Sequence, residues 1–194
     1  MGLHAAKPVA GDGFTPAMES EVLECPTLAE WTAGDGASMR VLPVAAQDLD
    51  LMRHFVKAMS AGSRYFRFGR LEVDFADEGM RCLCRQGAAG CIHLMVLKRD
   101  AYAAAVVGSG SVVLSTRGDT GELAIAVADR WQRHGVGRRL LMALAGSAKQ
   151  QGCREMHARV LATNRGTLAF LQCQGFTVLD APAEPWVKFV RRAL

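Results

Sequence analysis

The chain lacks a long apolar run and a recognisable targeting segment at its start. Its longest apolar stretch, residues 101–114, is interrupted by glycines and serines at 108–111 and is too short to span a bilayer. The first two dozen residues carry four acidic side chains and no apolar core of the kind found in a signal peptide. Ala6 stands where an N-myristoylation signal has Ser or Thr. We therefore expect a cytoplasmic protein with no membrane partner.

Positive charge is scarce in the first part of the chain. Residues 1–37 contain one Lys against six Asp and Glu, whereas residues 38–194 contain 22 Lys and Arg against 13 Asp and Glu. This contrast predicts an acidic, partly ordered N-terminal extension at 1–37 and a single domain at 38–194, large enough for its own core. A basic body suits a ligand with several phosphates. Its arginines are scattered and do not alternate with aromatics, so no nucleic-acid partner is expected.

Six cysteines are present, but nothing else indicates a disulfide framework. Without a secretory signal we expect reduced thiols, several of them buried, at Cys25, Cys82, Cys84, Cys91, Cys153 and Cys173. Three of them, with His93, place four soft ligands within twelve residues, which raises a zinc hypothesis. The spacing departs from a C-x₂-C knuckle. Cys82 and Cys84 fall in a helical pattern, whereas Cys91 and His93 fall in a strand pattern. No metal site is therefore expected.

Apolar periodicity predicts an α/β protein with a mixed sheet. Expected strands cover residues 39–44, 92–97, 102–115, 122–128, 156–161, 176–179 and 186–190. Expected helices cover residues 47–59, 60–68, about 76–86 and 136–152, and a last helix begins at Asn164. In the 122–128 strand, Leu123, Ile125 and Val127 form one face, and Glu122 lies with small alanines on the other.

The most informative segment is Gln132–Gly137, which joins a predicted strand to a predicted helix. The first N–H groups of a helix have no partner within it, and the helix dipole places partial positive charge where they point. Such a turn is suited to phosphate, and its two glycines allow a ligand to approach closely. Arg133, Arg138 and Arg139 add cations. The spacing fits neither a Walker P-loop nor a dinucleotide motif. An ordinary strand–turn–helix connection is the alternative.

A second segment, Asn164–Phe176, follows about 27 residues after the turn. Asn164 suits a helix N-cap, and Gly175 suits the position after a helix end. The Q-x-x-G-x-G turn and the N-x-x-x-L-x-F-L-x-x-x-G-F pattern of this segment resemble, in this order, two motifs of the GNAT family of N-acetyltransferases. Ser63–Gly69 also resembles the second-helix region of members close to bacterial protein-lysine acetyltransferases. The resemblance covers residues 39–192.

The resemblance implies a GNAT fold: a mixed, mostly antiparallel sheet, flanked by helices, in which the 122–128 and 156–161 strands splay. Acetyl-CoA would lie in this opening as co-substrate, with its pantetheine arm along residues 125–127 and its pyrophosphate on the turn. The cofactor-binding residues implied are Ile125, Ala126, Val127, Gln132, Arg133, His134, Gly135, Val136, Gly137, Arg138, Asn164 and Phe170. For Asn164, helix capping alone is the alternative.

Glu122 is the candidate general base, because it is the only ionisable residue of its strand. It also resembles the strand glutamate proposed as base in protein-lysine acetyltransferases. An incidental charge at the edge of the strand is the alternative, and His93 and His157 are other candidate bases. Leu171 occupies the position where many members have a tyrosine as general acid. Acyl transfer through Cys173 is not expected, since no adjacent His or Asp would activate the thiol.

The expected function is acetyl-CoA-dependent transfer of an acetyl group directly to a primary amine, either a small amine or a protein lysine. A catalytically silent acyl-CoA-binding regulator on the same fold is the alternative, because Leu171 leaves no tyrosine. The expected partners are acetyl-CoA and an amine acceptor, and we expect a monomer or a homodimer.

Overall fold

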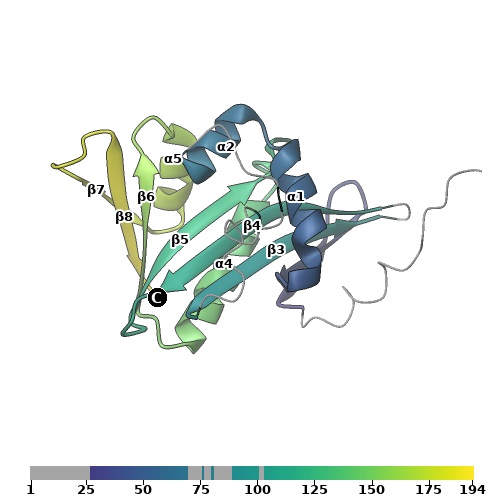
Figure 1. Cartoon of the computed structure of the whole chain (residues 1–194), viewed down its shortest axis with the longest axis horizontal. Helices are drawn as coiled ribbons and strands as arrows, with labels where there is room; N and C mark the ends of the chain where they lie inside the picture. Colours follow the sequence, from purple (N-terminus) through teal and green to yellow (C-terminus); the bar gives the residue numbers. More distant parts are fainter. Residues whose placement is uncertain (1–26, 70–75, 77–79, 81–88, 101–102) are drawn as a thin grey trace, which may run out of the picture.

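One mixed sheet forms the central layer of the protein. The computed structural model describes residues 27–69, 76, 80, 89–100 and 103–194. The strands are β1 (Ala29–Thr32), β2 (Ser38–Pro43), β3 (Cys91–Arg99), β4 (Ala104–Leu114), β5 (Thr120–Val127), β6 (Glu155–Leu161), β7 (Thr177–Asp180) and β8 (Val187–Ala193). They follow the order β1-β2-β3-β4-β5-β6-β8-β7 (Figure 1), and every neighbouring pair is antiparallel except β5 and β6. The predicted mixed, mostly antiparallel sheet is confirmed.

Helices cover both faces of this sheet. They are α1 (Leu49–Ala58), α2 (Ala61–Phe68), α4 (Val136–Gln150) and α5 (Arg165–Cys173), with short 3₁₀ turns at Ala46–Asp48 and Asp129–Trp131. α1 and α2 lie on one face, and α4 and α5 lie on the other (Figure 1). Met52 and Phe55 of α1 pack into the first interface, and Leu140 and Leu144 of α4 pack into the second. No helix within the described residues has the length and apolar character needed to cross a membrane.

The sheet includes a strand that the sequence did not predict. β1 falls within residues 1–37, which were expected to form an extension, and pairs with β2 from Ala29↔Val41 to Thr32↔Ser38. Its exposure alternates along the strand, and Trp31 lies half-buried beneath the Arg139 guanidinium. Four residues are too few to show a clear two-residue period in the sequence.

Two of the predicted helices differ from the observed elements or are described only in part. The helix predicted at 47–59 divides into a 3₁₀ turn and α1 next to Asp48, whose carboxylate accepts from the Ala45 N–H at 2.8 Å. Of the helix predicted at 76–86, only Ala76 and Met80 are described, and the Met80 N–H donates to Ala76 O at 2.9 Å. The rest of that segment lies outside the described residues.

β5 and β6 pair over a short distance and then diverge. The paired residues are Thr120↔Glu155, Gly121↔Met156 and Glu122↔His157. Beyond them β5 continues to Val127, and among the described strands its only neighbour there is β4. Gly121 lies at the base of the fork, where an added Cβ would be 2.5 Å from Val112 Cγ1, so a larger residue would force the sheet to shift. The predicted splay is confirmed, and it leaves one edge of β5 open to a ligand.

Candidate active site

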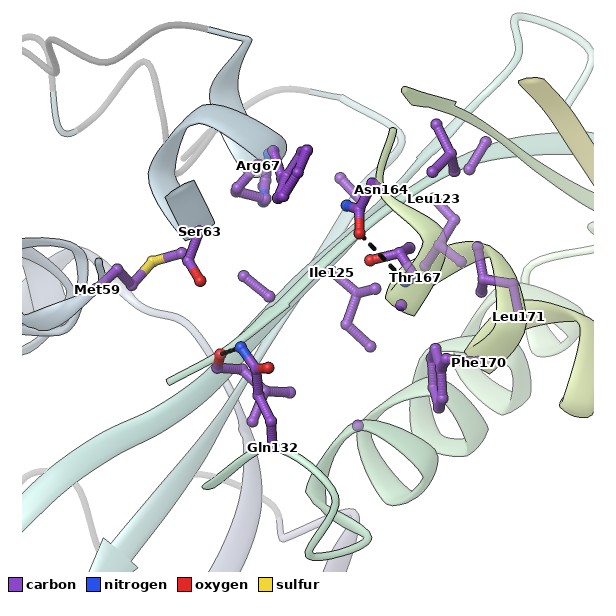
Figure 2. Close-up of a pocket in the computed structure, with 18 of the residues that line it drawn as sticks. Met59, Ser63, Arg67, Leu123, Ile125, Gln132, Asn164, Thr167, Phe170 and Leu171 are labelled. Carbon is purple, nitrogen blue, oxygen red and sulfur yellow. Dashed lines mark hydrogen bonds between the residues drawn. The ribbon is translucent and has the colours of Figure 1, made fainter. Parts of the chain in front are cut away.

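A cleft of about 1870 Å³ opens where β5 and β6 diverge. α2 forms one wall, α5 and the start of α4 form the other, and β5 is the floor between them (Figure 2). Small-molecule pockets usually measure roughly 300–1,000 Å³, so this cleft has room for an elongated ligand and a second reactant. The predicted site residues that line it are Glu122, Ile125, Ala126, Val127, Gln132, Arg133, Gly135, Gly137, Arg138, Asn164 and Phe170.

Two predicted cofactor-binding residues do not line the cleft. The Val136 side chain is 1% exposed and packs into the core with the leucines of α4. His134 is exposed, its Nδ1 lies 2.7 Å from Gln132 O, and its ring meets the edge of Trp131. Any contact of Val136 with a ligand would therefore have to come from its backbone atoms, whereas the exposed His134 ring lies outside the cleft lining.

The turn before α4 has the backbone that a phosphate site needs. Gly135, the N-cap of α4, is left-handed at φ 78°, and Arg133 has a φ of 62°, which is uncommon for a residue with a Cβ. The Gln132 side-chain amide donates to Val127 O at 3.2 Å and ties the turn to the end of β5 (Figure 2). The Arg139 N–H bonds to Gly135 O, so the preceding N–H groups of α4 have no acceptor in the helix. They are open to an anion.

Positive charge also lines the cleft. Arg133 and Arg138 lie on its wall, as does Arg165 in the first turn of α5. None of the three takes part in an ion pair with another described residue. Arg139 was expected to join them, but its guanidinium lies 4.7 Å from the Trp31 ring centroid and outside the cleft lining. Arg165 was missed because it belongs to a later helix than the turn.

Asn164 and Phe170 meet the cleft from α5. The Asn164 side-chain oxygen accepts from the Thr167 N–H at 3.2 Å and caps the helix (Figure 2). Its NH₂ group makes no hydrogen bond with the described part of the chain, so it can still donate to a ligand. The Phe170 ring packs over the start of α4, where a Cβ added to Gly137 would lie 3.5 Å from it. For Asn164, capping and ligand binding are therefore compatible.

Glu122 is an exposed carboxylate at the point where the two strands part. It shares a face of β5 with Ala124 and Ala126, whose small side chains line the cleft floor. On β6, Arg159 is hydrogen-bonded to Glu184. This bond raises the pKa of the Arg159 guanidinium, and attraction to Glu122 adds to the effect. Glu122 therefore lies in the open part of the cleft with a permanent cation nearby.

The two histidines considered as bases lie outside the cleft lining. His157 is opposite Glu122 in the sheet, but its ring stacks on Phe189 with centroids 5.4 Å apart. His93 Nε2 lies 2.8 Å from Ser109 Oγ, beside a separate cavity of only about 20 Å³. Each ring thus has a structural contact of its own.

Neither residue of α5 that was considered for chemistry supplies a reactive group to the cleft. Leu171 is 1% exposed and lines the wall, so an apolar side chain occupies the position expected for tyrosine. Cys173 is exposed and does not line the cleft.

Several polar residues of the cleft wall were not selected from the sequence. They are Ser60, Ser63, Arg67, Ser111, Arg159, Thr163, Arg165, Thr167 and Gln174. Ser111 is the most buried of them, at 4% exposed. Its signal in the sequence is the alternation of serine and glycine at 108–111, which places Ser109 and Ser111 on one face of an otherwise apolar strand.

The residues considered for zinc are only partly described. Cys82 and Cys84 lie outside the described residues, and Cys91 and His93 lie on β3. Where the structure describes side chains, no three His, Cys, Asp or Glu residues gather as a metal site requires.

Comparisons with known proteins agree with this geometry. A model of the acetyltransferase (GNAT) family matches residues 58–176. The GNAT domain of S. lividans PAT has a TM-score of 0.72 and 22% sequence identity, covering 86% of this chain and 96% of that chain. A search of curated proteins finds no match.

Two other solved structures share the fold at similar coverage. The acetyltransferase from Thermus thermophilus has a TM-score of 0.61 and 22% identity, covering 80% of this chain and 97% of that chain. The PaiA N-acetyltransferase from Thermoplasma acidophilum, in complex with coenzyme A, has a TM-score of 0.62 and 14% identity, covering 80% and 99%. The family model spans both walls of the cleft and more than half of the sequence. The chain therefore belongs to the GNAT family of acetyltransferases.

Proposed function

We propose that this protein transfers the acetyl group of acetyl-CoA directly to a primary amine, with Glu122 as general base. The observation that carries the proposal is the position of Glu122: an exposed carboxylate at the strand divergence, in the same cleft as a turn suited to phosphate. The acceptor is a small amine or a protein lysine. A positioned base, acting directly or through water, typically contributes about 10²- to 10⁴-fold to the rate.

The open edge of β5 supports this placement of the cofactor. The Ala128 N–H bonds to Val107 O of β4, and N–H groups alternate along a strand, so those of Ile125 and Val127 point toward the fork. In the proposal this edge pairs with the pantetheine arm and polarises the thioester carbonyl. The pyrophosphate lies against the turn with Arg133 and Arg138.

The leaving group of the proposed reaction does not require a general acid from the protein. A thiol has a pKa near 8.5, far below that of an alcohol, so a thiolate can leave without a side-chain acid. The apolar Leu171 is therefore compatible with turnover. It is also the observation that favours a second candidate function, a catalytically silent acyl-CoA-binding regulator.

Turnover separates the two candidates. The purified protein is incubated with acetyl-CoA and a panel that includes butylamine, Nα-acetyl-lysine amide and lysine-rich proteins, and release of the CoA thiol is followed. Amine-dependent release, with the acetylated product found by mass spectrometry, supports the enzyme. Tight calorimetric binding of CoA without release against any member of the panel contradicts it and supports the regulator.

A further inference from the structure

Ser111 is a buried residue whose hydroxyl has no partner among the described residues. Among the described residues, three buried side chains are polar or charged: Asp48, Ser109 and Ser111. Asp48 accepts from the Ala45 N–H, and Ser109 Oγ lies 2.8 Å from His93 Nε2. Ser111 makes no side-chain hydrogen bond within the described part of the chain, yet it lines the cleft. The Ser111 oxygen is not fully enclosed by protein atoms and keeps contact with the open space of the cleft, where a bound ligand can donate a hydrogen bond to it.

Ser111 and Glu122 lie on the same face of the sheet. In the β4–β5 ladder Ser111 pairs with Ala124 and Glu122 pairs with Val113, so the two polar residues are diagonal neighbours, roughly 7–8 Å apart. Ala124 ends at its methyl group and does not fill the space above the floor. One nitrogen placed between the two side chains can form hydrogen bonds of about 2.9 Å with both.

We propose that Ser111 binds the acceptor nitrogen: its hydroxyl accepts one N–H of the amine while Glu122 removes another proton. The inference rests on the proposed acetyl transfer and adds a second contact on the acceptor. It also gives a role to a hydroxyl on a residue that is only 4% exposed.

The two groups act on different protons of the nitrogen. The ammonium proton passes to Glu122 and then to solvent, and the nitrogen lone pair forms the N–C bond with the thioester carbon. As the C–S bond breaks, a second proton leaves the nitrogen and ends on the CoA thiol. One N–H remains in the amide, and Ser111 accepts from it throughout. A secondary amine has no N–H left for Ser111 in its product, so this site favours primary amines.

The sharpest test compares two serines of the same strand and the same face. Ser111→Ala removes a hydroxyl without a partner in the described part of the chain, so thermal stability should stay level or rise. Its kcat/KM for the best primary amine of the panel should fall about 10-fold, as expected for one lost hydrogen bond, with calorimetric acetyl-CoA affinity within twofold of wild type. Ser109→Ala removes the hydroxyl that lies 2.8 Å from His93 Nε2, so stability should fall while kcat/KM of the folded protein stays within twofold.

The possible outcomes are distinct. A wild-type protein that acetylates an amine, with Ser111→Ala within twofold of it, overturns the inference and leaves the proposed function standing. Equal loss of kcat/KM in both variants overturns it as well, because a general disturbance of β4 would then explain the loss without a contact between Ser111 and the amine. A wild-type protein that releases no CoA with any amine overturns the proposed function, and this inference with it.

Discussion

The Asp129 carboxylate accepts a hydrogen bond from the Ser63 hydroxyl at 2.7 Å, and this contact joins the two sides of the cleft. Asp129 also accepts from the N–H and the hydroxyl of Ser60, both at 3.0 Å. Ser60 is the N-cap of α2, in which no residue is fully buried, whereas Asp129 lies between β5 and the turn. A single carboxylate thus anchors the helix on one wall to the segment that carries the turn.

Replacing Asp129 should loosen α2 without unfolding the sheet. Asp129→Ala removes three hydrogen bonds to a charged group that is largely exposed, and we expect a loss of about 1–2 kcal/mol. Because α2 lines the cleft, the KM for the amine should rise several-fold, with a smaller change in acetyl-CoA affinity. Urea unfolding and amine titrations measure both. Asp180→Ala, which removes an exposed ion pair with Lys188, is the control and should cost less stability than Asp129→Ala.

The same carboxylate gives stability a pH dependence. Burial raises the pKa of Asp129, but hydrogen bonds from Ser60 and Ser63 lower it by more, so the pKa lies below its ordinary value. A carboxyl whose pKa is lower when folded stabilises the protein fully above its unfolded pKa and loses this contribution as pH falls through the folded pKa. Unfolding free energies of wild type and Asp129→Asn should therefore diverge above about pH 4 and converge at lower pH. Parallel curves across pH 3 to 7 would contradict this assignment.

Two consecutive arginines provide a matched test of the phosphate end. Arg138 lines the cleft, whereas Arg139 lies on Trp31. Arg138→Ala should weaken CoA binding about 10-fold, an effect that shrinks at high salt, because a charge-assisted contact is lost. Arg139→Ala should leave CoA affinity unchanged and reduce stability by about 0.5–1 kcal/mol through the lost ring contact. Calorimetry and thermal unfolding measure the two effects, and equal CoA affinities for both variants would refute the site.

Arg133 allows charge and backbone strain to be separated. A residue with a Cβ is disfavoured at its φ of 62°, whereas glycine adopts this conformation readily. Arg133→Gly should therefore weaken CoA binding several-fold while stability stays within about 1 kcal/mol of wild type. Gly135→Asp is a poorer probe, because the φ of 78° at Gly135 would strain the turn itself. If Arg133→Gly bound CoA as tightly as wild type, Arg133 would have no part in phosphate binding.

Glu122→Gln tests the mechanism. The amide keeps the size of the side chain but cannot take a proton at neutral pH. If Glu122 is the base, turnover should fall about 10²-fold or more with acetyl-CoA affinity little changed. The loss should be smaller at high pH, where more of the amine is already deprotonated. A variant within about threefold of wild type at neutral pH, with chemistry shown to be rate-limiting, would remove Glu122 from the mechanism and leave it as an incidental charge.

The parts of the site that the sequence predicted are those set by local pattern. The turn at 132–137 follows a strand and opens a helix, and its glycine at 135 takes the left-handed backbone that only glycine adopts freely. The polar position of Glu122 in an alternating strand likewise fixes the face on which it lies.

The parts that sequence could not give depend on contacts between distant segments. Arg139 turns away from the cleft because Trp31, more than a hundred residues earlier, lies under its guanidinium. His93 is engaged by Ser109 through the register of β3 and β4. Ser111 can be recognised as a candidate site residue only from the β4–β5 pairing, which places it diagonally from Glu122.

The two walls of the cleft differ in how freely they can change over evolution. α4 buries Leu140, Leu141 and Leu144 in the core, so substitutions on its inner face disturb the fold itself. α2 buries no residue completely; Asp129 holds its first turn, and Phe68 at its other end packs against the core. Substitutions on the exposed side of α2 can therefore change this wall of the cleft while the sheet and the opposite wall keep their packing. Four of the eight α2 residues are exposed, so this wall of the cleft can vary in shape and charge without changes in the core.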